Sequence, residues 1–141
     1  MFNSSLNTKS SIHIIHENQE WTNPLFEELR KLDTPFEDWN MSHSIIDVSA
    51  KAPKGIFYNR MSASSHTRGN RFAPESTIGL LAWLESQNSI TINGRNALNL
   101  EISKMVQYAC LNKVGLNVPS TIAVSKKEDI IDAYNKLNIR E

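Results

Sequence analysis

The sequence has few of the features that identify disulfide-bonded, zinc-binding, membrane or secreted proteins. Its one cysteine, Cys110, can form no internal disulfide, and a lone thiol supports no zinc cluster. This usage indicates a reducing cytoplasm. No apolar run approaches the roughly 20 residues that cross a bilayer. The polar first eleven residues lack the apolar centre of a signal peptide, so we expect a disordered tail at 1–11 and a cytoplasmic protein without a membrane partner.

An excess of charge of either sign is also absent. Fifteen basic and fifteen acidic side chains give a formal net charge of zero. A nucleic-acid binder usually shows a clear basic excess, so we expect no nucleic-acid partner. The apolar fraction of 40% is too high for a disordered chain, and 141 residues suffice for about one domain with its own core.

Familiar cofactor and metal motifs are missing as well. The sequence contains neither a G-x-G-x-x-G fingerprint nor a P-loop. His13 and His16 are three residues apart in an expected strand, so they point to opposite faces and cannot share an ion. His43 and His66 have no partner at ligand spacing. We therefore expect no metal site, and we expect Cys110 to be a packed thiol beside an apolar helix stripe.

What is present is an alternation of strands and helices. Expected strands lie at 12–16, 44–48, 55–58, 89–92 and 121–124. One expected helix begins at Thr22-Asn23-Pro24 and another begins at Pro74. A third spans 97–114, and a fourth follows a Ser125-x-x-Glu128 capping box. The three tryptophans, Trp21, Trp39 and Trp83, are expected to pack in or against the core. Each connection is long enough for a crossover. The pattern favours an α/β fold with a small, mainly parallel sheet flanked by helices.

The most informative segment is residues 59–72, which we name the arginine loop. It leaves the carboxyl end of an expected strand, where α/β sheets bind ligands. It holds three arginines, a histidine and four hydroxyls but no acidic residue; the first acid after it is Glu75. Guanidinium groups match carboxylates and phosphates, and the helix expected at Pro74 adds its positive N-terminus. The composition predicts an anion site; a solvated loop whose arginines pair with distant acids remains the alternative.

Several segments together resemble a known family. Tyr58-Asn59-Arg60-Met61-Ser62, Thr67-Arg68-Gly69, Leu80-Leu81-Ala82-Trp83-Leu84-Glu85 and Thr91-Ile92-Asn93-Gly94 resemble the amino-terminal domain of RimK-type ATP-grasp ligases, which are related to glutathione synthetases. Leu100-Glu101-Ile102-Ser103-Lys104 and Gly115-Leu116-Asn117-Val118-Pro119-Ser120-Thr121 resemble the start of their ATP-grasp domain. The resemblance implies a pre-ATP-grasp-like domain over 12–96. Residues 97–141 would then begin a truncated nucleotide-binding domain with its first β/α unit.

The resemblance also implies a reaction. Such ligases use ATP and Mg²⁺ to phosphorylate a carboxylate, and an amine then attacks the acyl phosphate to form an amide or peptide bond. Lys104, which composition alone places on a solvated helix face, matches the lysine that contacts the ATP phosphates. Arg60 and Arg68 match arginines of the substrate-side loop. Ser62 and Ser65 are expected hydroxyl contacts there, and the resemblance supplies no catalytic residue within this chain.

The resemblance ends before the second nucleotide-binding lysine, the mobile glycine-rich loop and the magnesium ligands. Phosphoryl transfer needs the metal and the charge clamp together, so we expect this chain alone not to catalyse ligation. One alternative is a non-catalytic module that binds a small carboxylate or amino acid. Another is a subunit that pairs with a separate carboxy-terminal catalytic chain. Self-association into a homo-oligomer also stays open.

Overall fold

The computed structural model describes residues 11–138. The chain divides into two compact units, Met1–Ile102 and Ser103–Glu141, and each is described by itself. The expected tail lies outside the described residues except for Ser11, which begins the first strand. None of the helices within residues 11–138 has the length and apolar character that a membrane crossing requires.

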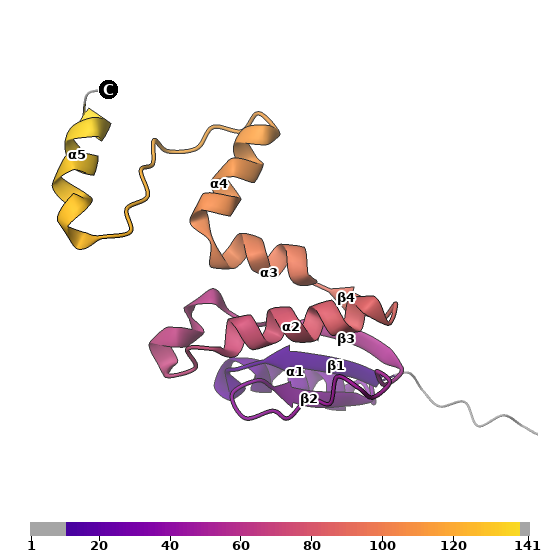
Figure 1. The fold of residues 1–141 in the computed structure, drawn as a ribbon. Helices are drawn as coiled ribbons and strands as arrows, with labels where there is room; N and C mark the ends of the chain where they lie inside the picture. Colours follow the sequence, from indigo (N-terminus) through magenta and orange to yellow (C-terminus); the bar gives the residue numbers. More distant parts are fainter. Residues whose placement is uncertain (1–10, 139–141) are drawn as a thin grey trace, which may run out of the picture. The chain divides into compact units, whose positions relative to one another are not determined.

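The first unit is built on a parallel sheet of four strands (Figure 1). In the order β2-β1-β3-β4, these are β2 (Phe36–Asn40), β1 (Ser11–His16), β3 (Gly55–Asn59) and β4 (Ile90–Ile92). Every strand pair is parallel, and β1 pairs with both β2 and β3. The predicted α/β class with a small parallel sheet is confirmed.

Two helices enclose this sheet and create two apolar cores. Ile14 of β1 packs with Phe26 and Leu29 of α1 (Gln19–Lys31). Ile15, the next residue, packs instead with a cluster from α2 (Ala73–Ser86), whose buried members include Leu80, Leu81 and Leu84. Successive side chains of a strand point to opposite faces, so β1 is buried on both sides, as a central parallel strand requires.

The strand predicted at 44–48 is wrong. That segment is irregular, and β2 takes the place beside β1 instead, with Phe36 opposite Ile12. Asp47 accepts hydrogen bonds from the backbone and the hydroxyl of Ser49, a local turn that competes with strand pairing. Ile45 is fully exposed. The strand predicted at 89–92 is confirmed as β4.

Two helix boundaries differ from the predicted positions, because side chains cap the helices at other residues. Asn18, not Thr22, caps α1, because its side chain accepts from the backbone N–H of Trp21. The helix predicted at 97–114 is broken into α3 (Arg95–Ile102) and α4 (Lys104–Lys113). Ser103 interrupts it, since its hydroxyl accepts from the N–H of Val106 and caps α4.

The second unit contains α4, a short 3-10 helix η2 (Lys127–Asp129) and α5 (Ile130–Asn138). The strand predicted at 121–124 does not form. The predicted capping box is wrong, because Lys126 occupies the cap position of η2 and no side chain bonds there. Cys110 is exposed rather than packed.

The tryptophans divide between core and surface. Trp39 and Trp83 are half-buried and pack against the core on the α2 face, as predicted. Trp21 is 58% exposed, so the prediction that it packs in or against the core is wrong. Its ring instead lies beneath an arginine of the arginine loop, as described below.

Candidate anion-binding site at the strand ends

The strand order makes the carboxyl ends of β1 and β3 the topological switch point of the sheet. The chain leaves β1 towards β2 on one side and later returns to β3 on the other. Such a reversal is where open α/β sheets bind ligands. Arg60, the first residue after β3, donates its N–H to the carbonyl of Ile15 in β1 at 2.7 Å. The arginine loop therefore starts at this switch point.

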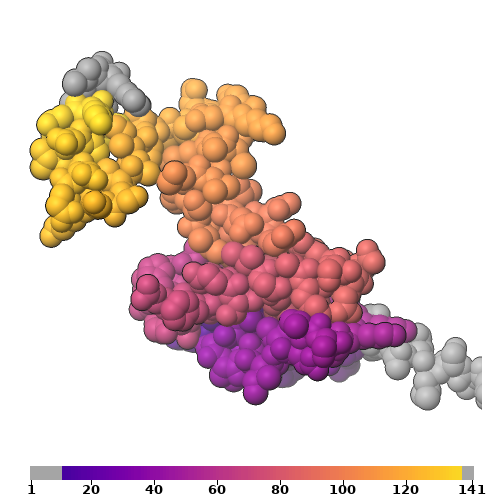
Figure 2. All heavy atoms as spheres, viewed as in Figure 1, coloured from indigo at the N-terminus to yellow at the C-terminus, as the bar shows by residue number. Residues whose placement is uncertain are grey.

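Within the loop, residues Ala63–Arg68 form a 3-10 helix, η1. Ser62 caps it, and its hydroxyl accepts from the N–H of Ser64 at 3.3 Å. Ser65 is fully buried and donates its hydroxyl to the carbonyl of Asn70 at 3.1 Å. Gly69 closes the turn with a φ of 84°, a left-handed conformation that favours glycine. Figure 2 shows this loop, coloured magenta to pink, at the surface of the first unit. Both predicted serines thus shape the loop.

Arg68 is held by a buried acid. Its Nη2 donates to Glu17, whose side chain is only 1% exposed, and its Nη1 donates to Ser64 at 3.3 Å. The guanidinium carbon lies 4.7 Å from the centroid of the Trp21 ring. The backbone N–H of Ser62 also approaches Glu17, at 3.4 Å. Arg68 therefore neutralises Glu17 and joins the loop to the end of β1.

Arg60 and Arg71 are placed differently. Both are exposed, and neither has a carboxylate partner within residues 11–138. The guanidinium of Arg60 lies 5.8 Å from the Tyr58 ring, and that of Arg71 lies 5.5 Å from the Phe72 ring. Their forks are thus open to an external anion, whereas Arg68 is engaged.

A pair of asparagines fixes the start of the loop. Asn59, at the end of β3, donates to the carbonyl of Asn93 at 2.8 Å, and Asn93 donates back to the carbonyl of Asn59 at 3.3 Å. The side-chain oxygen of Asn59 also accepts from the N–H of Met61 at 3.0 Å. Sequence reasoning missed Asn59, Asn93 and Glu17. The available signal was a polar residue at or just beyond the end of a strand.

Lys104 belongs to the second unit, while Arg60, Ser62, Ser65 and Arg68 lie together in the first. It is the first residue of α4, is exposed, and donates from Nζ to Gln107 at 2.8 Å. The ammonium group is therefore free to meet a solvent-borne anion after a change of rotamer.

Within residues 11–138, no three His, Cys, Asp or Glu side chains gather closely enough to hold a metal ion. His13 stacks on Phe57, with centroids 4.4 Å apart, on the α2 face of the sheet. His16 contacts Phe26 on the α1 face and lies 2.7 Å from a carboxylate oxygen of Asp38. The prediction that the two histidines point to opposite faces is confirmed.

Comparison with protein-family models gives no match for this sequence, and comparison with curated proteins gives none either. The arrangement itself combines the switch point of the sheet, two exposed guanidinium groups without a carboxylate partner among the described residues, and a loop held by internal hydrogen bonds. Arginine forks of this kind bind carboxylate or phosphate through paired charge-assisted hydrogen bonds. The geometry therefore suits the capture of a small anion at the carboxyl edge of the sheet.

Proposed function

We propose that this chain is the amino-terminal portion of an ATP-dependent carboxylate–amine ligase whose substrate carboxylate binds at the arginine loop. The observation that carries the proposal is the exposed guanidinium of Arg60 at the switch point between β1 and β3, without a carboxylate partner within residues 11–138. The ordered resemblance of residues 54–137 to RimK-type ligases supplies the reaction class. A pre-ATP-grasp-like first unit followed by the start of an ATP-grasp domain is part of the same proposal.

The side chains of the loop have different roles in this proposal. Arg60 makes the direct contact, because its fork is free to bind both oxygens of a carboxylate. Arg68 is engaged by Glu17 and contributes by holding the loop at the end of β1. Ser62 and Ser65 keep the shape of η1 through their cap and turn hydrogen bonds.

Mg-ATP, when bound, supplies the phosphoryl group that activates the carboxylate. Lys104 fits a phosphate contact, since it presents an exposed ammonium group on the first turn of α4. The described residues offer no matching set of metal ligands. The proposal therefore assigns substrate binding and one phosphate contact to residues 11–138, and no step of phosphoryl transfer. The exposed thiol of Cys110 is compatible with the reducing cytoplasm proposed as its compartment.

The first test is the intact mass of the protein purified from its own cells. A mass well above 16.0 kDa fits the ligase, and that protein is then assayed with Mg-ATP, single carboxylates and hydroxylamine. An acyl phosphate reacts with hydroxylamine to give a hydroxamate, so one carboxylate should yield ADP and a hydroxamate in equal amounts. A mass near 16.0 kDa, or the absence of both products across the carboxylate panel, would overturn the proposal. Calorimetry with small carboxylates and no ATP would then test the binding-module alternative.

A substitution in the natural protein tests the assignment of Arg60. Arg60→Ala should raise the KM for the carboxylate by about tenfold or more, because one charge-assisted hydrogen-bond pair is lost. Arg30→Ala is the matched control, since Arg30 is exposed on α1 and faces the Phe26 and Phe36 rings. An unchanged KM for Arg60→Ala, with a raised KM for Arg71→Ala, would transfer the contact to Arg71.

A further inference from the structure

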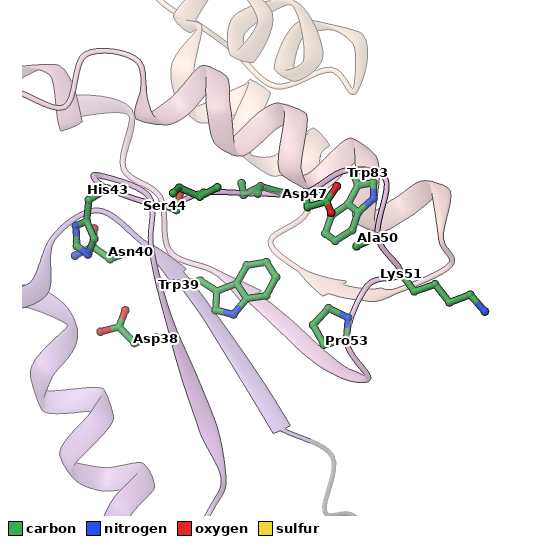
Figure 3. Close-up of a pocket in the computed structure, with 12 residues that line it drawn as sticks. Asp38, Trp39, Asn40, His43, Ser44, Asp47, Ala50, Lys51, Pro53 and Trp83 are labelled. Atoms are coloured by element: carbon green, nitrogen blue, oxygen red, sulfur yellow. The ribbon is translucent and has the colours of Figure 1, made fainter.

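A second candidate site lies on the α2 face of the sheet, away from the arginine loop. A cavity of about 530 Å³ lies between the end of β2, the connection from β2 to β3, and Trp83 of α2; its lining side chains are drawn in Figure 3. This connection contains no helix. No residue that lines the cavity belongs to residues 59–72. The cavity is thus a separate site from the arginine loop.

Two indole rings, those of Trp39 and Trp83, line the cavity. Trp39 is held in place by edge-on contacts with Phe57 and His13, at centroid distances of 5.4 and 5.3 Å. Its Nε1 donates towards a carboxylate oxygen of Glu37 at 3.4 Å. A carboxylate at the N–H edge of an indole adds electron density to the ring, which strengthens the attraction of its face for a cation. Indole faces are the best cation–π partners among the aromatic side chains.

The charged groups at the cavity also favour a cation. Ser49 donates both its N–H and its hydroxyl to Oδ1 of Asp47, at 2.9 and 2.6 Å, which leaves Oδ2 for a ligand. Figure 3 shows the Asp47 carboxylate beside the Trp83 ring, whereas the Lys51 side chain points away from the cavity. Asp38 also lines the cavity, but its carboxylate bonds to His16, which packs on the other face of the sheet.

We propose that this cavity binds a small organic cation, namely a protonated amine on an apolar or aromatic body. The ammonium group donates to Oδ2 of Asp47, and the body packs against Trp39 and Trp83. The site needs neither ATP nor the arginine loop, so it stands or fails independently of the ligase proposal.

The test uses the indole N–H resonances of the full 141-residue chain in ¹⁵N NMR spectra, assigned with single Trp→Phe variants. The probe is phenethylamine, and its neutral and anionic counterparts are 2-phenylethanol and 3-phenylpropanoate. Phenethylamine should shift the Trp39 and Trp83 resonances saturably and leave the Trp21 resonance unmoved. The affinity should fall from the amine to the alcohol and fall again to the acid.

Asp47→Asn should weaken phenethylamine binding by about tenfold, because a hydrogen bond to a charged group is lost, and should leave 2-phenylethanol binding unchanged. Asp132→Asn, an identical charge change on exposed α5, should leave both affinities unchanged. Asp47 is exposed, so its substitution leaves the core intact. Equal affinity for amine and alcohol, an effect of Asp132→Asn as large as that of Asp47→Asn, or unmoved Trp39 and Trp83 resonances would each overturn the proposal.

Discussion

Arg68 donates a hydrogen bond to the carboxylate of Glu17, a buried group that lies 51 residues earlier in the chain. The pair joins the segment that follows β1 to the loop that follows β3. A buried carboxylate is stable only when a cation or several donors compensate it. Composition alone suggests that Arg68 binds an external anion, but in the folded protein its charge neutralises Glu17.

Arg68→Ala should lower the free energy of unfolding by about 3 kcal/mol or more, because it leaves Glu17 buried and uncompensated. Arg60→Ala, an exposed arginine in the same loop, should change that free energy by less than about 0.5 kcal/mol. Urea unfolding of the two variants provides the comparison. Equal stabilities would mean that the Glu17 carboxylate is solvated in solution.

Asn59→Ala should destabilise the protein by about 2 kcal/mol, since two hydrogen bonds are lost and the Met61 N–H and Asn93 carbonyl lose their partner. Asn117→Ala, at an exposed position of irregular chain, is the control and should change stability by less than about 0.5 kcal/mol. Amide hydrogen exchange gives a local readout, because protection of the Met61 amide should fall first. Retained protection at Met61 would contradict the assigned role.

Gly55→Ala and Gly79→Ala should have opposite effects on stability. Gly55 has a φ of 151°, and a Cβ there would lie 2.2 Å from the carbonyl oxygen of Ser11. We expect a loss of at least about 3 kcal/mol, or failure to fold. Gly79 lies within α2 with open space around it, so alanine should add about 0.5–1 kcal/mol. Thermal unfolding measures both changes, and a stable Gly55→Ala variant would show that β3 enters the sheet differently.

The hydrogen bonds from the hydroxyl and the backbone N–H of Ser49 lower the pKa of Asp47 below its ordinary value. A depressed folded-state pKa gives stability that is present above the unfolded-state value and is lost as the pH falls through the folded-state value. Ser49→Ala should therefore raise the pKa of Asp47, which a ¹³C NMR titration of the carboxyl group measures. Phenethylamine binding should weaken as the pH falls through the same pKa. An unchanged pKa in Ser49→Ala would mean that the hydroxyl bond does not persist in solution.

The strands and helices that could be predicted from the sequence are those whose own residues favour that secondary structure. The central strand at 12–16 carries an apolar, β-branched run that suits burial on both faces, and β1 and both cores confirm that role. The edge strand β2 was missed because Phe36-Glu37-Asp38-Trp39-Asn40 has two acids and no β-branched residue. Its position depends on pairing with β1, which is a tertiary effect that local propensity does not contain.

For the candidate site, the sequence predicted only which types of residue gather in one loop. The run of arginines and hydroxyls correctly marked the loop that leaves β3, because strand ends and irregular segments are recognisable from sequence. Which arginine is free was not predictable, since that depends on Glu17 and Trp21, which precede Arg68 by 51 and 47 residues and meet it only in the folded unit. The break between α3 and α4 was not predicted, because the only local signal was one polar residue, Ser103, within a regular helical pattern.

The central place of β1 has a consequence for folding during synthesis. During synthesis β1, α1 and β2 emerge before β3, and these elements form one half of the sheet with the core of Ile14, Phe26 and Leu29. The other edge of β1 then waits unpaired until residues 55–59 emerge. At the usual rate of translation, about 5–20 residues per second, that interval is of the order of one to a few seconds. During this time the open edge of the nascent chain is exposed to pairing with other extended segments, and chaperone binding in this window should protect it.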